Sequence, residues 1–177
     1  MLRKQILLLL GAAPAVFVVI AVWRAAPGFF GPASLPTDDT ASRLAFAARW
    51  LLLPGVTLMA GILAVGRRGF IPEAVDGTRT SANHGLEIDL RYNQNTLEQT
   101  VLAAIAWSGL ALALPHPRLA LIPAMAGLFL IGRIAFLIGY RFDPLGRAFG
   151  MVLTELPTLG AYVWLVARVL GAHPASL

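Results

Sequence analysis

Three polar residues near the middle of the chain are spaced so that a helix would carry them on one face. Arg91, Asn95 and Glu98 stand at positions i, i+4 and i+7, and the apolar stretch that follows begins at Thr96. Glu98 lies about one helical turn inside the apolar stretch. A carboxylate at that depth in a membrane is costly unless it pairs with another group. The spacing indicates a polar site at the end of a membrane span. The alternative is an interfacial helix start whose long side chains reach back to water.

A second set of polar residues stands further along the chain. Arg133 and Tyr140 are seven residues apart and share a helical face, and Arg147 starts the last apolar stretch after the helix-breaking pair Asp143-Pro144. Arg133 lies about two turns inside its span and needs a partner there. We expect that partner to be Glu98, facing it across helices or between subunits.

The composition excludes several kinds of chemistry. The chain has no cysteine, so a disulfide, a thiolate metal site and a cysteine nucleophile are excluded, and any thiol would come from a substrate. His84 stands among scattered acids without metal-ligand spacing, so no metal site is expected. The net charge is +5, but the 14 basic residues are scattered rather than gathered in a stripe, which argues against nucleic-acid binding.

Five apolar stretches must hold these residues in place. They cover residues 5–23, 44–66, 96–114, 119–140 and 148–170, and each has about the 17–25 residues that a helix needs to cross a bilayer. The whole chain is 58% hydrophobic and 13% charged, against about a quarter charged in soluble domains. The stretches lack the alternating polarity of transmembrane barrels. We expect an all-α integral membrane helical bundle in contact with the lipid bilayer.

The first stretch has some features of a signal peptide. Arg3 and Lys4 precede it, but its uncharged run is longer than the roughly 7–15 residues of a signal-peptide core, and Phe29 and Phe30 make a poor cleavage site. We therefore predict a retained membrane helix and two parts of the chain. Residues 1–42 would form an N-terminal transmembrane anchor helix with an outer loop, and residues 43–177 a four-helix membrane domain.

The basic residues near the span ends indicate the orientation, because cytoplasmic loops are enriched in lysine and arginine. With the N-terminus inside, the basic residues on the inner side are Arg3, Lys4, Arg67, Arg68, Arg79, Arg91, Arg141 and Arg147. Those on the outer side are Arg24, Arg43, Arg49, Arg118 and Arg168. The inner excess predicts a cytoplasmic N-terminus, which puts both polar sets at the cytoplasmic ends of their helices.

Two further features of the spans concern packing. Glu155 lies about two turns into the last span, where it has either a functional role or a polar neighbour such as Thr154. Small residues are expected where helices pack closely, and those expected here are Gly127, Gly132 and Gly150.

The two polar patterns together resemble the MAPEG family, the membrane-associated proteins of eicosanoid and glutathione metabolism. Arg91-x-x-x-Asn95-x-x-Glu98 is followed by the spacing Arg133-x6-Tyr140-x6-Arg147, with Gly139 before the tyrosine. The resemblance covers roughly residues 43–170, and the run from Asn95 to Gln99 looks like that of bacterial members. It implies a bacterial inner-membrane protein with a four-helix MAPEG-like protomer, residues 43–177, plus one extra N-terminal transmembrane helix.

The resemblance also implies a homotrimer that binds glutathione, as co-substrate, between adjacent subunits at the cytoplasmic side. The residues that would contact the glutathione peptide are Arg91, Asn93, Asn95, Glu98, Arg133 and Tyr140. Arg147 stands where the family's arginine is held to stabilise the glutathione thiolate, and a guanidinium near sulfur lowers the pKa of a thiol. The thiolate would then attack a hydrophobic small-molecule electrophile entering from the bilayer.

These features favour a membrane-embedded glutathione-dependent transferase or peroxidase acting on lipophilic electrophiles. Gln99 and Phe136 stand near positions where some relatives have tyrosines that contact glutathione. The alternative is therefore a non-catalytic MAPEG-fold membrane protein that binds a lipid or a partner. A third reading, a small transporter, is motivated by the charges within spans, but the clearest of these gather near one face instead of tracking across the bilayer.

Overall fold

The chain folds into a bundle of long helices. The computed structural model describes residues 2–31, 34–77 and 83–171, and Arg79, expected on the inner side, lies outside them. The helices are α1 (Leu2–Phe29), α2 (Thr40–Trp50), α3 (Leu52–Gly66), η2 (Arg67–Phe70), α4 (His84–Ala113), η3 (His116–Ala120), α5 (Leu121–Phe142) and α6 (Ala148–Val169). Within the described ranges there is no strand, and five helical segments are long and apolar enough to cross a membrane. The all-α prediction is confirmed.

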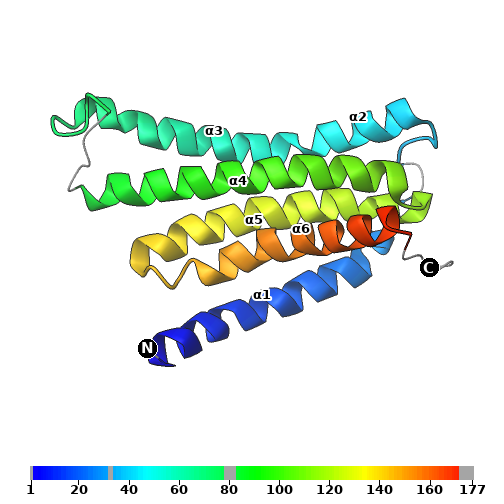
Figure 1. Cartoon of the computed structure of the whole chain (residues 1–177), viewed down its shortest axis with the longest axis horizontal. Helices are drawn as coiled ribbons and strands as arrows, with labels where there is room; N and C mark the ends of the chain where they lie inside the picture. The colour runs from blue at the N-terminus through cyan, green and yellow to red at the C-terminus, as the bar shows by residue number, and fades with distance from the viewer. Residues whose placement is uncertain (1, 32–33, 78–82, 172–177) are drawn as a thin grey trace.

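The helices run side by side along the long axis of the molecule (Figure 1). α4 and α5 lie in the middle, with α2 and α3 on one side and α6 and then α1 on the other. The N-terminus, the start of α4 and the turn between α5 and α6 share one end of the bundle. We call the end that holds Arg91 and Arg147 the site end, and the end that holds Leu114 and Arg118 the far end.

The second span starts earlier than its apolar stretch because a polar residue caps it. The Asp39 carboxylate accepts a hydrogen bond from the backbone N–H of Ser42 at 2.8 Å, so α2 begins at Thr40. The bond to Ser42 lowers the pKa of this carboxyl, which lies outside the span. The helix breaks at Leu51 because Pro54 has no N–H and its ring crowds the carbonyl four residues earlier. α2 and α3 together therefore form the second span.

Arg43 joins the start of α2 to the far end of α4. Its guanidinium donates hydrogen bonds to the carbonyl oxygens of Ala111 at 3.1 Å and Leu114 at 2.8 Å. These carbonyls end a helix and would otherwise lack a partner, so a cation is well placed there. The same guanidinium donates to the Asp38 carboxylate at 2.7 Å, and this bond lowers the pKa of Asp38. The loop before α2 is thereby held against the bundle.

A cluster of ion pairs holds the site end together. The Asn83 side chain caps α4 by accepting the Leu86 N–H at 3.0 Å. Further along α4, the buried Asp89 carboxylate lies 2.8 Å from the Arg67 guanidinium and 3.5 Å from that of Arg141. These two pairs tie η2 and the end of α5 to α4. A buried carboxylate is retained only when it is paired in this way.

α5 and α6 approach each other so closely that glycine is required at their contact. A methyl group added at Gly150 would overlap the carbonyl oxygen of Gly132 and the backbone nitrogen of Phe136. Backbone therefore packs directly on backbone, as expected for Gly132 and Gly150. No atom of the described residues lies within 4 Å of a methyl group added at Gly127, so the expectation that it packs closely against another helix of the chain is wrong for the described part.

α1 is packed along the bundle rather than held apart from it. Ala15 and Val19 of α1 are buried in one apolar cluster with Leu128 of α5 and Leu153 of α6. Apolar burial of this kind, together with close packing, places α1 beside α6 (Figure 1). The division of the chain into residues 1–42 and 43–177 stays a prediction.

Replacing Gly150 with alanine should destabilise the bundle, because the new methyl group forces α5 and α6 apart. Overpacking of this kind costs about 1–3 kcal/mol. The measurement is the thermal unfolding midpoint of the purified protein in detergent. Gly127→Ala is the matched control: it also adds a methyl group inside a membrane-length helix, but no described atom lies within 4 Å of that group, so the midpoint should stay unchanged. Equal midpoints for the two variants would contradict the direct contact between the helices.

Candidate glutathione site

Four of the residues predicted from the sequence line one open pocket at the site end. The pocket has a volume of about 460 Å³ and lies between the N-terminal half of α4 and the start of α6. Its lining residues are Leu90, Arg91, Gln94, Asn95, Glu98 and Arg147. Arg91, Asn95 and Glu98 come from one face of α4, as their spacing predicts, and Arg147 comes from the turn before α6.

The charged groups of the pocket remain accessible to water. Arg91 pairs with Glu87 at 2.8 Å and Gln94 donates to Glu98 at 2.9 Å, and each pair joins residues one helical turn apart. All four side chains are exposed. Within the described ranges no carboxylate pairs with Arg147. The pocket therefore offers two guanidinium groups and one carboxylate to a ligand that carries charges of both signs.

Arg133 lies behind the pocket and has no exposed surface. Its guanidinium donates to the Asn95 side-chain oxygen at 2.7 Å and to the Thr154 hydroxyl. It also lies over the aromatic rings of Phe129, at 5.6 Å, and Phe136, at 4.8 Å, where a cation is attracted to the ring faces. Arg133 thus joins α4, α5 and α6 and fixes the orientation of a pocket residue, Asn95.

The prediction that Glu98 is the partner of Arg133 within the chain is wrong. Glu98 is exposed and accepts its hydrogen bond from Gln94, while Arg133 bonds to Asn95 instead. Asn95 precedes Glu98 by three residues on the same face of α4, and it lies nearer to α5. The helix spacing predicts the shared face but not which of its residues reaches the neighbouring helix. A contact between Arg133 and Glu98 of different subunits stays a prediction.

Tyr140 positions Arg147. The Arg147 guanidinium lies 4.9 Å from the centre of the Tyr140 ring, and that ring packs edge-on against Phe136 at 5.6 Å. Arg147 also precedes Ala148, the first residue of α6. The N-terminal end of a helix carries partial positive charge, so a negative group beside Arg147 is attracted by both the guanidinium and the helix.

Asn93 is the one predicted site residue of α4 that turns away from the pocket. Its side-chain oxygen lies 2.8 Å from where a methyl group on Gly61 would stand, so it faces α3. This oxygen is buried and has no hydrogen-bond partner within the described ranges. Asn93 is two residues from both Arg91 and Asn95, which puts it on a different face of the helix. Its contact with glutathione stays a prediction.

Two residues beside the predicted set also shape the site, and the spacing of the polar residues indicated neither role. Gln94 lines the pocket and orients Glu98, and Thr154 holds Arg133. Thr154 was linked to Glu155, the next residue, but its hydroxyl bonds to Arg133 and to the Met151 carbonyl. Thr154 stands seven residues, or about two helical turns, after Arg147, and this spacing is the signal that could have revealed its place beside the site. Glu155 itself is exposed.

A smaller pocket adjoins the first through Arg147. Its volume is about 190 Å³, and it lies between α1 and the first turns of α6. Ala12, Met151 and Val152 contribute apolar surface, and Glu155 contributes a carboxylate. Arg147 therefore stands between a polar pocket and a mostly apolar one. In the described ranges no group of three or more histidine, aspartate or glutamate residues could hold a metal ion.

The sequence of the chain matches the model of one known protein family. The model of the MAPEG family matches residues 6–167, most of the chain. The chain belongs to the MAPEG family. Comparisons with curated proteins and with solved structures found no match. As a MAPEG member with five membrane-length helices, the chain is an integral membrane protein of a family concerned with glutathione and lipid metabolism.

The family match also bears on α1. It begins at residue 6 and so includes most of the helix that we expected to lie outside the common four-helix plan. The motif-bearing helices of this MAPEG chain are α4, with Arg91, Asn95 and Glu98, and α5, with Arg133. The matched region thus contains all the residues that line the polar pocket and the smaller pocket.

Replacing Thr154 with valine should destabilise this MAPEG chain. Valine keeps the shape but leaves part of the buried Arg133 guanidinium without an acceptor, which costs about 1–3 kcal/mol. Thr158→Val is the matched control. Thr158 is about equally buried, but its hydroxyl donates only to the Thr154 carbonyl oxygen in its own helix. Thermal unfolding in detergent is the measurement. If both variants have the same unfolding midpoint, the hydrogen bond between Thr154 and Arg133 does not stabilise the fold.

Proposed function

We propose that this MAPEG chain is a membrane-embedded glutathione-dependent transferase or peroxidase that acts on lipophilic electrophiles. The observation that carries the proposal is the open pocket in which Arg91, Asn95, Glu98 and Arg147 lie together. The family generally uses glutathione, and this pocket has the groups that glutathione requires.

The charges of the pocket match those of glutathione. Glutathione carries two carboxylates and one ammonium group, and the pocket offers Arg91 and Arg147 to the carboxylates or the thiolate and Glu98 to the ammonium. The Asn95 oxygen is occupied by Arg133, so its amide nitrogen is left to donate to a peptide carbonyl. Arg91 and Glu98 already have partners on their own helix, in Glu87 and Gln94, whereas Arg147 pairs with no carboxylate within the described ranges.

Arg147 is the residue that we assign to the reaction. A guanidinium beside the glutathione sulfur favours the thiolate, and the thiol proton passes to water in the open pocket. The thiolate forms a C–S bond with an electrophilic carbon while the leaving group departs with its electron pair. In the peroxidase form of the reaction, two glutathione molecules become the disulfide, and the hydroperoxide becomes an alcohol and water.

The smaller pocket supports a lipophilic second substrate. It shares Arg147 with the polar pocket, and its apolar residues Met151 and Val152 lie on a membrane-spanning helix. An electrophile dissolved in the bilayer could therefore approach the sulfur from the lipid side without crossing water. A homotrimer in which a neighbouring subunit covers the open polar pocket would keep glutathione apart from bulk solvent.

The orientation proposed for the protein is an N-terminus in the cytoplasm of a bacterial inner membrane. The inner excess of basic residues supports it, and the N-terminus lies at the same end of the bundle as the polar pocket (Figure 1). The cytoplasm is also the compartment that holds reduced thiols.

The second candidate is a non-catalytic MAPEG protein that binds a lipid or a partner. Gln99 and Phe136 favour it because neither supplies the aromatic hydroxyl found in some relatives, and both side chains are buried rather than in the pocket. The absence of both glutathione binding and conjugation in the purified protein would support this candidate.

Replacing Arg147 with glutamine should strongly reduce the amount of bound glutathione thiolate. Loss of a neighbouring positive charge raises the thiol pKa, so the thiolate at neutral pH should fall by about tenfold or more. Thiolate absorbance in the ultraviolet and conjugation of a model aryl halide are the measurements, made on the purified assembled protein. Arg141→Gln removes the same charge from the last turn of α5, six residues before Arg147, where Asp89 still has Arg67, and should keep both signals.

Two outcomes would contradict the proposal. Thiolate absorbance retained in the Arg147→Gln protein would exclude Arg147 as the stabilising group. Failure of the unchanged protein to bind glutathione sulfonate, a thiol-free analogue, would exclude the glutathione site itself. A transporter or lipid binder has no reason to recognise that analogue.

A further inference from the structure

A second large cavity lies at the far end of the bundle. Its volume is about 470 Å³, and α1, α4, α5, α6 and η3 all contribute to it. Leu114 of this cavity stands 23 residues after Arg91 along α4, which separates the cavity from the polar pocket by roughly 34 Å. The cavity therefore belongs to neither pocket that surrounds Arg147.

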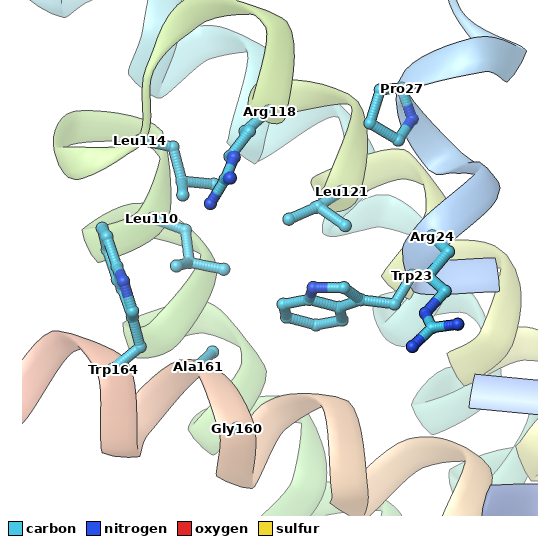
Figure 2. A pocket seen from close by; sticks show the side chains of 10 residues that line it. All are labelled: Trp23, Arg24, Pro27, Leu110, Leu114, Arg118, Leu121, Gly160, Ala161 and Trp164. Carbon is cyan, nitrogen blue, oxygen red and sulfur yellow. The ribbon is translucent and has the colours of Figure 1, made fainter. Parts of the chain in front are cut away.

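The walls of this cavity are apolar and reach into the hydrocarbon region. Leu110 and Leu121 form one side, and Figure 2 shows Trp23 and Trp164 at opposite sides of the space. Gly160 lines the cavity nine residues before the end of α6, a depth of about 13 Å along the helix. No atom lies within 4 Å of a methyl group added at Gly160, so the space there is open. A slot of this depth suits an acyl chain.

The cavity also has cationic groups that the chain leaves unneutralised. Arg24 and Arg118 both line it. Within the described ranges neither forms an ion pair, and the acids of the neighbouring outer loop are engaged, since Asp38 pairs with Arg43 and Asp39 caps α2. Arg24 stands five residues inside the end of α1, where a guanidinium without a negative partner is costly. A negatively charged ligand would offset that cost.

We propose that this cavity binds a phospholipid whose head group carries a net negative charge. The head group lies at the end of the cavity that Arg24 and Arg118 line, and one acyl chain fills the slot between Trp23 and Trp164. A zwitterionic lipid fits less well, because the described wall has no carboxylate to receive its ammonium group. A small soluble anion fits less well because most of the wall is apolar. The tryptophans suit this position, since such rings favour the membrane interface.

The experiment measures lipid binding to the purified full-length protein by native mass spectrometry. The protein is taken from bilayers of equal phosphatidylglycerol and phosphatidylcholine, and the masses identify which lipid remains bound. Phosphatidylglycerol should be preferred, and each arginine should contribute about fivefold to its affinity. The double variant Arg24→Gln, Arg118→Gln should therefore lose the preference. Gly160→Leu fills the slot and should weaken the binding of both lipids.

Arg49→Gln is the matched control for charge. Arg49 is exposed on α2 and does not line the cavity, so its loss should leave the preference for phosphatidylglycerol unchanged. Equal losses in the control and in the cavity variants would overturn the proposal, because general surface charge would then explain the binding. Displacement of the lipid by inorganic phosphate at equal concentration would also overturn it, since a free anion would then be the ligand.

One further outcome assigns the cavity to a different occupant. If Gly160→Leu changes the oligomeric mass of the protein while lipid binding stays the same, a second copy of the chain covers this face, and the proposal is wrong. Glutathione sulfonate binding, measured on the same samples, reports separately on the polar pocket about 34 Å away.

Discussion

The burial of Arg133 constrains the arrangement of the three helices that form the polar site. A guanidinium without water must obtain its hydrogen bonds from the protein, and here α4 supplies Asn95 and α6 supplies Thr154. The bond to Thr154 forms where α5 and α6 touch through Gly132 and Gly150. The contact between α5 and α6 beside Arg133 therefore also sets the distance between the pocket face of α4 and the start of α6.

The positive charge of Arg133 has a consequence for the neighbouring pocket. Within the described ranges no carboxylate pairs with it, and the contacts that surround it are an amide, a hydroxyl and two aromatic rings. Its charge therefore adds to the field of Arg91 and Arg147, which favours an anionic ligand. Arg133 affects a bound ligand indirectly, because it orients Asn95 and adds positive charge behind the pocket. Arg147 lies in the pocket itself.

Much of this site could be predicted from the sequence, because helical spacing decides which residues share a face. Arg91, Asn95 and Glu98 lie together for that reason, and Arg147 joins them because a helix break precedes it. Spacing within one helix does not decide which residue meets the next helix. Asn95 rather than Glu98 therefore reaches Arg133, and Thr154 was linked to the wrong neighbour.

In the fold, too, features that depend on neighbouring residues could be predicted from the sequence, and contacts between distant residues could not. The five membrane-length helices follow from apolar runs, which are local in sequence. The ion pairs of Asp89 join residues more than twenty positions apart, and no periodicity indicates them. The far-end cavity likewise depends on how α1 rests on α6, a contact between the first and last helices of the chain.

The central claim is that one pocket at the site end binds glutathione with its sulfur beside Arg147. The most direct test is a cryo-electron microscopy structure of the purified, assembled protein with glutathione sulfonate. The account predicts ligand density against Arg91, Asn95 and Glu98, with the sulfonate next to the Arg147 guanidinium. Ligand density in another part of the protein, or a sulfonate directed away from Arg147, would contradict it.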